Sequence, residues 1–332
     1  MRDLLPALVV APMAGGPSTP ALVTAAARAG ALGFLAAGYR TPEAVESSLR
    51  AVGGIPYGLN IFAPTPPAAP GPIERYREVL RPEAQRYDID LPPLRLSDDD
   101  HYAAKIDLAA AYGVPVVSFT FGVPDRAVVA RLRSVGCRIL ITVTSAAEAA
   151  RAVAVEPDGL IAQGGTAGGH AATFDAAGYR GETTAASVLA AVRKVTDLPV
   201  IAAGGTGTAA DVAALLDAGA FAVQAGTAFL LADEAGTRPA HRAAMLAGAT
   251  QETVITRAFT GRPARALRNR FTETYSALAP VGYPAVHHLT APIRAAAAAR
   301  NDPGALNLWA GTGFPTARPE PLADVVARLR LE

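Results

Sequence analysis

The sequence alternates eight short apolar runs with alanine-rich stretches, and this alternation constrains the fold more than any other feature. The runs are almost continuously apolar, as expected for parallel strands that are covered on both faces. Repeated strand and helix units predict an α/β fold with a parallel sheet. The expected strands are Ala7 to Ala11, Leu32 to Ala36, Tyr57 to Phe62, Val114 to Thr120, Arg138 to Val143, Gly159 to Gln163, Pro199 to Ala203 and Phe221 to Ala225.

The stretches between these runs carry helix signals. Thr19, Thr41 and Thr208 each stand where an N-cap is expected, two of them are followed by proline, and all three stretches close on glycine. Eight such units in 332 residues predict a (β/α)8 TIM barrel over residues 1–229, although two domains of ordinary size would also fit the length.

Two segments within the barrel region interrupt the alternation. Residues 63–100 are rich in proline and charge, and we interpret them as an excursion after the third strand with a helix from Ile73 to Arg86. Residues 164–182 lengthen the connection after the sixth strand.

After the eighth strand the character of the chain changes. Residues 230–300 contain no convincing strand, so we expect a smaller helical cap that shapes the substrate site, with helices from Pro239 to Thr250 and from Ala291 to Arg300. Residues 301–332 form a tail whose final helix, from Pro321, is expected to pack on the barrel.

The charge balance argues against nucleic acid as a partner. The net charge is +1, and the arginines at 262, 265, 268 and 270 are expected to form a local helix surface. At the N-terminus, two prolines and Asp3 argue against a signal peptide, and no run of about 18 apolar residues is uninterrupted, so we expect a soluble protein without a membrane segment.

The cysteine and histidine content argues against a metal centre. Cys137 is the single cysteine, which excludes an internal disulfide and agrees with a cytoplasmic location. We expect it to be a small buried hydrophobe. The five histidines show no ligand spacing with carboxylates, so no metal is predicted. His287 and His288 belong to the cap, where a packing role is favoured, although one could face the substrate.

The loop after the sixth strand contains the candidate catalytic residue. Gln163 ends the strand, and four glycines and His170 follow within seven residues. Glycine permits close approach of backbone to a ligand, and imidazole titrates near neutrality. We therefore take His170 as the candidate base. A solvated surface histidine is the alternative interpretation.

Two further glycine loops predict a phosphate site. Gly204, Gly205 and Gly207 follow the seventh strand and lead into a helix at Ala209, whose N–H groups and dipole favour an anion. Gln224, Ala225, Gly226 and Thr227 close the eighth strand. In parallel barrels these two loops commonly hold phosphate.

The same stretch also fits a dinucleotide fingerprint. Gly205, Gly207 and Ala210 match G-x-G-x-x-A after a strand. That interpretation needs an acidic residue at the end of the next strand, where Gln224 and Gly226 stand instead. We therefore favour the phosphate interpretation.

Other strand ends supply polar or flexible groups. Met13 and Gly15 follow the first strand, and Asn60, Thr142 and Gln163 lie in later ones. Together with the phosphate loops they describe a site for a flat heteroaromatic phosphate such as FMN. Alternatively, Asn60 and Gln163 only satisfy loop backbone groups.

These motifs together resemble the nitronate monooxygenases, also called 2-nitropropane dioxygenases. The resemblance rests on motifs in a fixed order: Pro12-Met-Ala-Gly-Gly, Gly58-Leu-Asn60, Gln163 with Ala167-Gly-Gly-His170, Ala203-Gly-Gly205, Gln224-Ala-Gly-Thr227 and Asn307-Leu-Trp-Ala-Gly. It implies an FMN-containing barrel with a helical lid in which His170 is the base. Flavin-contacting positions would be Met13, Gly15, Asn60, Gln163, Gly168, Gly169, Gly204, Gly205, Gln224, Ala225, Gly226 and Thr227. Thr142 departs from relatives that place a lysine near the flavin.

The resemblance implies oxidation of alkyl nitronates, or of nitroalkanes, with O2 to a carbonyl compound and a nitrite-type product. An NAD(P)H-dependent reductase of a quinone or an enoyl thioester is the alternative on the same barrel. A non-catalytic barrel that binds a phosphorylated metabolite is the third hypothesis. The expected partners are a small-molecule substrate and O2, and the sequence leaves open whether the chain forms a homo-oligomer.

Overall fold

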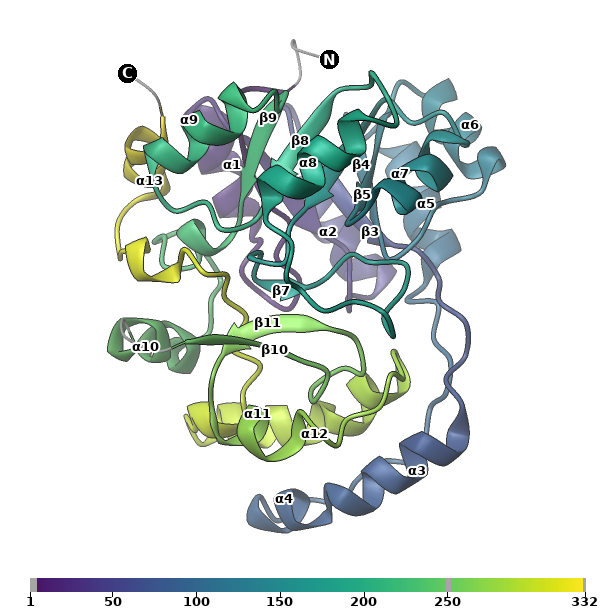
Figure 1. Ribbon diagram of the computed structural model, residues 1–332, viewed down its shortest axis with the longest axis vertical. Helices are drawn as coiled ribbons and strands as arrows, with labels where there is room; N and C mark the ends of the chain where they lie inside the picture. Colours follow the sequence, from purple (N-terminus) through teal and green to yellow (C-terminus); the bar gives the residue numbers. More distant parts are fainter. Residues whose placement is uncertain (1–4, 249–251, 331–332) are drawn as a thin grey trace.

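The computed structural model describes residues 5–248 and 252–330, and within them the expected barrel is closed (Figure 1). The parallel strands pair in the order β1-β2-β3-β4-β5-β6-β8-β9, and β9 pairs back onto β1. The prediction of a (β/α)8 barrel is confirmed, with each strand within two residues of its expected bounds. The barrel strands are β1 Leu8–Val10, β2 Leu32–Ala36, β3 Gly58–Phe62, β4 Val116–Thr120, β5 Arg138–Val143, β6 Gly159–Gln163, β8 Val200–Ala203 and β9 Ala222–Ala225.

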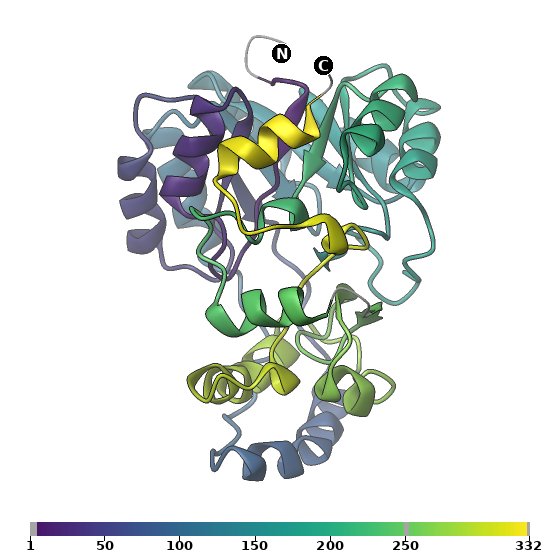
Figure 2. The ribbon, with the colours of Figure 1, turned by 90° about the vertical axis from the view of Figure 1, so that its left-hand side faces the viewer.

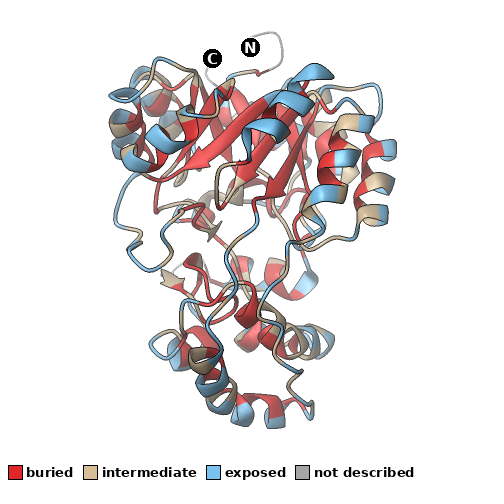
Figure 3. Cartoon of the chain, turned by 90° about the vertical axis from the view of Figure 1, so that its right-hand side faces the viewer, coloured by how far each residue is buried: buried red, intermediate tan, exposed pale blue. Residues whose placement is uncertain are grey.

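Closure of the sheet decides between the two interpretations of the glycine loop after β8. A doubly wound dinucleotide fold needs an open sheet with a point where the strand order reverses. Here β8 pairs with β9 and the ring closes, so the dinucleotide interpretation is wrong. Val9, Phe34, Leu140, Ile161 and Ile201 fill the barrel interior, and most residues of the strands are buried (Figure 3).

Helices cover the outside of the barrel. Thr19, Thr41 and Thr208 are N-caps as predicted, each accepting a hydrogen bond from the backbone N–H three residues on. The C-terminal helix packs its apolar face in the same cluster as Leu22 and Ala26 (Figure 2). The outer helices are α1 Pro20–Arg28, α2 Pro42–Ala51, α5 Tyr102–Ala111, α6 Arg126–Ser134, α7 Ala146–Val153, α8 Ala185–Arg193, α9 Ala209–Asp217 and α13 Leu322–Leu329.

The cap contains strands, so the expectation that residues 230–300 lack them is wrong. β10 Thr253–Thr256 pairs antiparallel with β11 Ala264–Leu267, and β11 pairs with β7 Gly169–His170 from the barrel loop. The strands are four residues or shorter, and Ala264 to Leu267 has the composition of a helix. Pairing between segments distant in sequence overrides that propensity.

The cap helices also differ from expectation. The final residues of the helix predicted over Pro239 to Thr250 lie outside the described part of the chain. The long cap helix begins six residues before the predicted Ala291, and Pro292 lies in its interior, a position that proline usually avoids. The helical segments are η1 Thr227–Phe229, α10 Pro239–Ala247, α11 Arg270–Tyr275 and α12 Ala285–Ala299.

The arginines at 262, 265, 268 and 270 do not form a helix surface, and that prediction is wrong. Arg262 is 5% exposed and lies in the loop between β10 and β11, whereas Arg265 lies within β11. Only Arg270 belongs to a helix. A strand and a buried loop therefore separate residues that helical spacing had grouped together.

The excursion packs against the cap. The predicted single helix is two, α3 Pro70–Val79 and α4 Arg81–Arg86, and Pro82 lies in the first turn of the second. Ile73, Tyr76 and Leu80 join a core with cap residues such as Phe271, below the barrel in Figure 1.

The first part of the tail also belongs to the cap core. Leu306, Leu308 and Ala310 join that core, and two short turns, η2 Pro303–Ala305 and η3 Phe314–Thr316, flank them. Only α13 of the tail lies in the barrel core. The segment between the two cores therefore crosses the mouth of the barrel.

The ion pair between Glu83 of the excursion and Arg270 of the cap gives a stability prediction. Arg270 Nη1 lies 2.5 Å from Glu83 Oε2, and the Glu83 side chain is 4% exposed. Arg270→Met would leave a buried carboxylate without its cation, so we expect a loss of about 3 kcal/mol in the free energy of unfolding. Arg268→Met is the matched control, because Arg268 pairs with the exposed Glu252 and should change stability by less than about 0.5 kcal/mol. Denaturant unfolding measures both, and equal losses would contradict this interpretation.

Candidate active site

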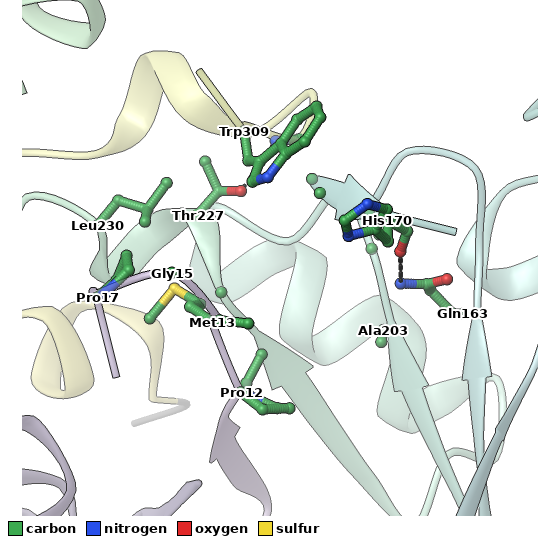
Figure 4. Close-up of a pocket in the computed structure, with 18 of the residues that line it drawn as sticks. Pro12, Met13, Gly15, Pro17, Gln163, His170, Ala203, Thr227, Leu230 and Trp309 are labelled. Atoms are coloured by element: carbon green, nitrogen blue, oxygen red, sulfur yellow. Dashed lines mark hydrogen bonds between the residues drawn. The ribbon is translucent and has the colours of Figure 1, made fainter. Parts of the chain in front are cut away.

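A cavity of about 220 Å³ lies at the carboxyl ends of the barrel strands, beneath the cap. A buried water needs only about 10–15 Å³, so the cavity has room for a ligand much larger than a water molecule. Figure 4 shows that Met13, Gln163, His170 and Thr227 reach its wall from separate elements. The structure brings every predicted site residue to this cavity: Met13, Gly15, Asn60, Gln163, Gly168, Gly169, His170, Gly204, Gly205, Gln224, Ala225, Gly226 and Thr227. Thr142 lines it as well.

His170 is fixed from both sides of its backbone. It lies in β7, paired with Ala264 of the cap strand β11. The Gln163 amide nitrogen donates to the His170 carbonyl at 3.1 Å, and the Gln163 amide oxygen accepts from the Ala172 N–H at 2.7 Å. Gln163 therefore pairs with backbone groups of the loop, which was the alternative role predicted for it. It also lines the cavity.

Thr260 of the cap orients the imidazole. Its Oγ1 lies 2.9 Å from His170 Nε2 and 3.3 Å from the Arg262 carbonyl oxygen. The hydroxyl can accept a hydrogen bond from the Nε2–H group while donating its own hydrogen to that carbonyl. This arrangement leaves Nδ1 of His170 with a free lone pair, as a proton acceptor requires.

The surroundings keep His170 neutral. Burial, with the nearby Arg262 and Arg294 guanidinium groups, lowers the pKa of His170 to about 3. A negative charge that develops beside the imidazole would offset both cations and raise this pKa. The site is therefore arranged so that the base gains strength as an anion forms.

The glycine loop after β8 differs from expectation at one point. We predicted an anion at the N-terminus of α9, but Asp211 of the chain itself fills that role. Its Oδ2 accepts from the N–H groups of Gly207 and Thr208, both at 2.9 Å. Among the described residues, no group accepts from the N–H of Gly205 or Thr206, so these two donors remain for a ligand.

Buried polar atoms without partners face the same cavity. Gln224 Oε1 and Thr206 Oγ1 have no hydrogen-bond partner in the described ranges, although both side chains are less than a tenth exposed. Such groups are costly unless a ligand or water pairs with them. Thr227 Oγ1 accepts from the Gly311 N–H at 2.9 Å, which leaves its own hydrogen free to donate. These groups fit a polar, phosphorylated cofactor.

Close backbone approach explains one of the loop glycines. A Cβ on Gly168 would lie 2.4 Å from the Gly311 nitrogen, so only glycine lets the His170 loop meet the tail segment that includes Trp309. The Trp309 ring lies 5.3 Å from the His170 ring. The tail thus closes one side of the cavity.

The aromatic residues that form one wall of the cavity were not identified from the sequence. Tyr39 and Phe121 follow β2 and β4, and both adopt left-handed backbone, with φ of 67° and 81°. This conformation costs bulky residues energy, and it persists mainly at functional sites. Phe121 comes directly after β4 and Tyr39 lies three residues after the end of β2, so the rule applied to the other strand ends would have identified them. Arg294 of the cap carries no such signal.

His287 and His288 have different surroundings. His287 stacks on Tyr39 with ring centroids 4.1 Å apart, next to the cavity. His288 Nε2 lies 2.8 Å from Asp98 Oδ2 of the excursion. Cys137 is 1% exposed, as predicted. In the described ranges no group of three or more potential ligands could hold a metal, and no helix is long and apolar enough to span a membrane.

His241 gives a prediction of acid sensitivity. It lines the cavity at 9% exposure, and burial lowers its pKa to about 4 despite the Trp309 carbonyl, with Arg238 lowering it further. Because the folded pKa lies below the ordinary 6.5, this group stabilises the fold above pH 6.5, and that contribution is lost as pH falls towards 4. We expect His241→Gln to reduce the loss of unfolding free energy on acidification by up to roughly 1.4 kcal/mol per pH unit in that window. Denaturant titrations at pH 7 and pH 5 measure it, and parallel losses in both proteins would contradict it.

Comparison with known proteins agrees with this geometry. Residues 2–332 match the family model described as nitronate monooxygenase. The chain belongs to the nitronate monooxygenase family. A nitronate monooxygenase from Paraburkholderia phytofirmans is 35% identical over all of this chain and 94% of its own length. A probable nitronate monooxygenase from Staphylococcus saprophyticus is 33% identical over 92% of this chain and 88% of its own.

A solved structure extends the comparison to three dimensions. The nitroalkane oxidase from Streptomyces ansochromogenes superposes with a TM-score of 0.93 at 44% identity, over 99% of this chain and 96% of that one. This member of the nitronate monooxygenase family is therefore an enzyme, a flavin-dependent oxidoreductase, and the family resemblance inferred from the motifs is confirmed.

Proposed function

We propose that the enzyme binds FMN in this cavity and uses O2 to oxidise alkyl nitronates to a carbonyl compound and a nitrite-type product. The observation that carries the proposal is the meeting of the phosphate loops, the partnerless polar atoms and the neutral His170 in one cavity. Bound FMN would supply the electron-accepting and O2-reacting chemistry, and the protein would supply orientation and electrostatics.

Each part of the cavity has a role in this proposal. The N–H groups of Gly205 and Thr206 and the Thr227 hydroxyl would hold the phosphate. Met13, Gly15, Asn60, Gln163, Gly168 and Gly169 would lie along the ring system, while Gln224, Ala225 and Gly226 would contact the ribityl chain and Gly204 would shape the phosphate loop.

His170 would act on the substrate. Its neutral imidazole can accept the carbon proton of a nitroalkane, or orient a nitronate that enters as the anion. We place this reaction in the cytoplasm, the compartment that the single cysteine favours.

The test begins with an absorbance spectrum of the purified protein and identification of the chromophore released on denaturation. We expect flavin bands and FMN, followed by oxygen uptake with ethyl nitronate and little with NADH. A colourless protein would contradict the cofactor. Oxygen uptake with NADH but not with the nitronate would favour the reductase alternative.

A further inference from the structure

An arginine of the cap reaches the cavity without a carboxylate partner. Arg294, in α12, lines the cavity together with His170 and Tyr39. Its Nη2 donates to the His287 carbonyl at 2.8 Å, and its Nε donates to Thr290 Oγ1 at 3.3 Å. Its Nη1 has no acceptor in residues 5–248 and 252–330.

The guanidinium remains charged at neutral pH. Burial lowers the pKa of Arg294 to about 10, and the groups that act on it are Tyr39 and a second cation, Arg238. No described carboxylate lies within ion-pair distance of it. A desolvated cation without a counter-charge is unfavourable, and a bound anion would relieve that cost.

Neither His287 nor Tyr39, the aromatic groups near Arg294, supplies a negative charge to it. A guanidinium only donates, so His287 Nδ1, 3.3 Å from Arg294 Nη2, faces it as an acceptor. Burial and Arg294 itself lower the pKa of His287 well below its ordinary value, so this ring adds no charge. Burial raises the pKa of Tyr39 far above neutrality, so its hydroxyl stays protonated beside Arg294. The Tyr39 hydroxyl is therefore a second donor, on a residue that lines the cavity together with Arg294 and feels its charge.

The apolar wall of the cavity lies next to this polar pair. Tyr39 contacts Phe62 edge to face, with ring centroids 5.4 Å apart, and Phe62 contacts Phe121 at 4.5 Å. Phe121 in turn lies 5.6 Å from the His170 ring. A ligand with a small oxyanion at one end and a short alkyl group at the other would match this lining.

We propose that Arg294, with the Tyr39 hydroxyl, binds the oxygen atoms of the nitro or nitronate group and so sets the preference of the enzyme for anionic substrates. The inference rests on the proposed function for the identity of the substrate. Arg294 would hold the oxygens while the aromatic wall holds the alkyl chain, and the reacting carbon would then face His170. The same guanidinium would stabilise the charge that develops when a neutral nitroalkane loses its proton.

Two readouts on the flavin-loaded enzyme test this role. The first is the dissociation constant of nitrate, a planar oxyanion that does not turn over, measured by calorimetry. The second is the split between KM and kcat for ethyl nitronate. We expect Arg294→Met to raise both the nitrate dissociation constant and KM about 10- to 100-fold, the range for losing a charged hydrogen bond. We expect kcat to change less than KM.

Arg257→Met is the matched control. Arg257 is another cap arginine without a carboxylate partner in the described ranges, its Nε donates to the Ala279 carbonyl at 3.3 Å, and it does not line the cavity. This variant should keep nitrate affinity and KM. If Arg294→Met loses flavin or melts early, Arg294→Gln gives the same comparison with a side chain that retains hydrogen bonding.

The outcomes separate the two proposals. Unchanged nitrate affinity and KM in the folded Arg294 variant would overturn the role of Arg294, as would failure of the unmodified enzyme to bind nitrate. Arg294-dependent nitrate binding without turnover of any nitronate would support the anion site and contradict the proposed function.

Discussion

Replacing His170 with asparagine is expected to reduce turnover of neutral nitroalkanes by roughly 10²- to 10⁴-fold while flavin stays bound. Asparagine cannot accept a carbon proton, and its shorter side chain also gives up the hydrogen bond between the imidazole Nε2 and Thr260 Oγ1, which are 2.9 Å apart. Turnover of preformed nitronates should fall much less, because their proton is already lost. Steady-state oxygen uptake with nitroethane and with ethyl nitronate measures the two effects separately.

His288→Asn is the control for the loss of a partly buried histidine. His288 lies outside the cavity lining and contacts Asp98, and its side chain is 24% exposed. We expect it to leave the ratio of the two turnover numbers unchanged. Equal losses with both substrates in the His170 variant would remove His170 from the role of base and leave it an orienting residue.

Gly205→Ala is expected to weaken flavin binding at least about tenfold, which corresponds to about 1.4 kcal/mol. Gly205 has φ of +78°, and a Cβ there would lie 2.9 Å from Thr166 Oγ1. The added methyl group must shift the loop, and the shift moves the N–H groups of Gly205 and Thr206 that we assign to the phosphate. Flavin retained after dialysis, and its dissociation constant by fluorescence titration, measure the effect.

Gly219→Ala separates backbone strain from cofactor contact. Gly219 follows α9 with φ of +92°, and its nearest potential contact is 3.5 Å away. Both variants should lose about 1–2 kcal/mol in the free energy of unfolding, because alanine is strained in the left-handed backbone conformation. Only Gly205→Ala should release flavin. Similar flavin loss in both variants would place the phosphate elsewhere.

Much of this site could be predicted because parallel barrels gather the ends of their strands at one mouth. Asn60, Gln163, Gly205 and Gln224 are far apart in sequence, yet each stands at or near the end of an apolar run. Once eight runs were recognised, the fold itself brought these residues together. The same rule would have added Tyr39, which lies three residues after the end of β2.

The cap could not be predicted in the same way, because its structure depends on pairing with the barrel. β11 has the composition of a helix and becomes a strand only against β10 and the two residues of β7. Thr260 reaches His170, and Arg294 reaches the cavity, only once the cap has folded. The side chains expected to select the substrate therefore come from the segment in which local sequence signals are weakest.

Bound flavin and His170 are expected to act together on a nitronate in this cavity. Anaerobic mixing of the purified enzyme with ethyl nitronate, followed by flavin absorbance, tests it most directly. We predict that the flavin bands bleach at least as fast as steady-state turnover and return when O2 is admitted. Flavin that stays oxidised with the nitronate but bleaches rapidly with NADH would contradict it.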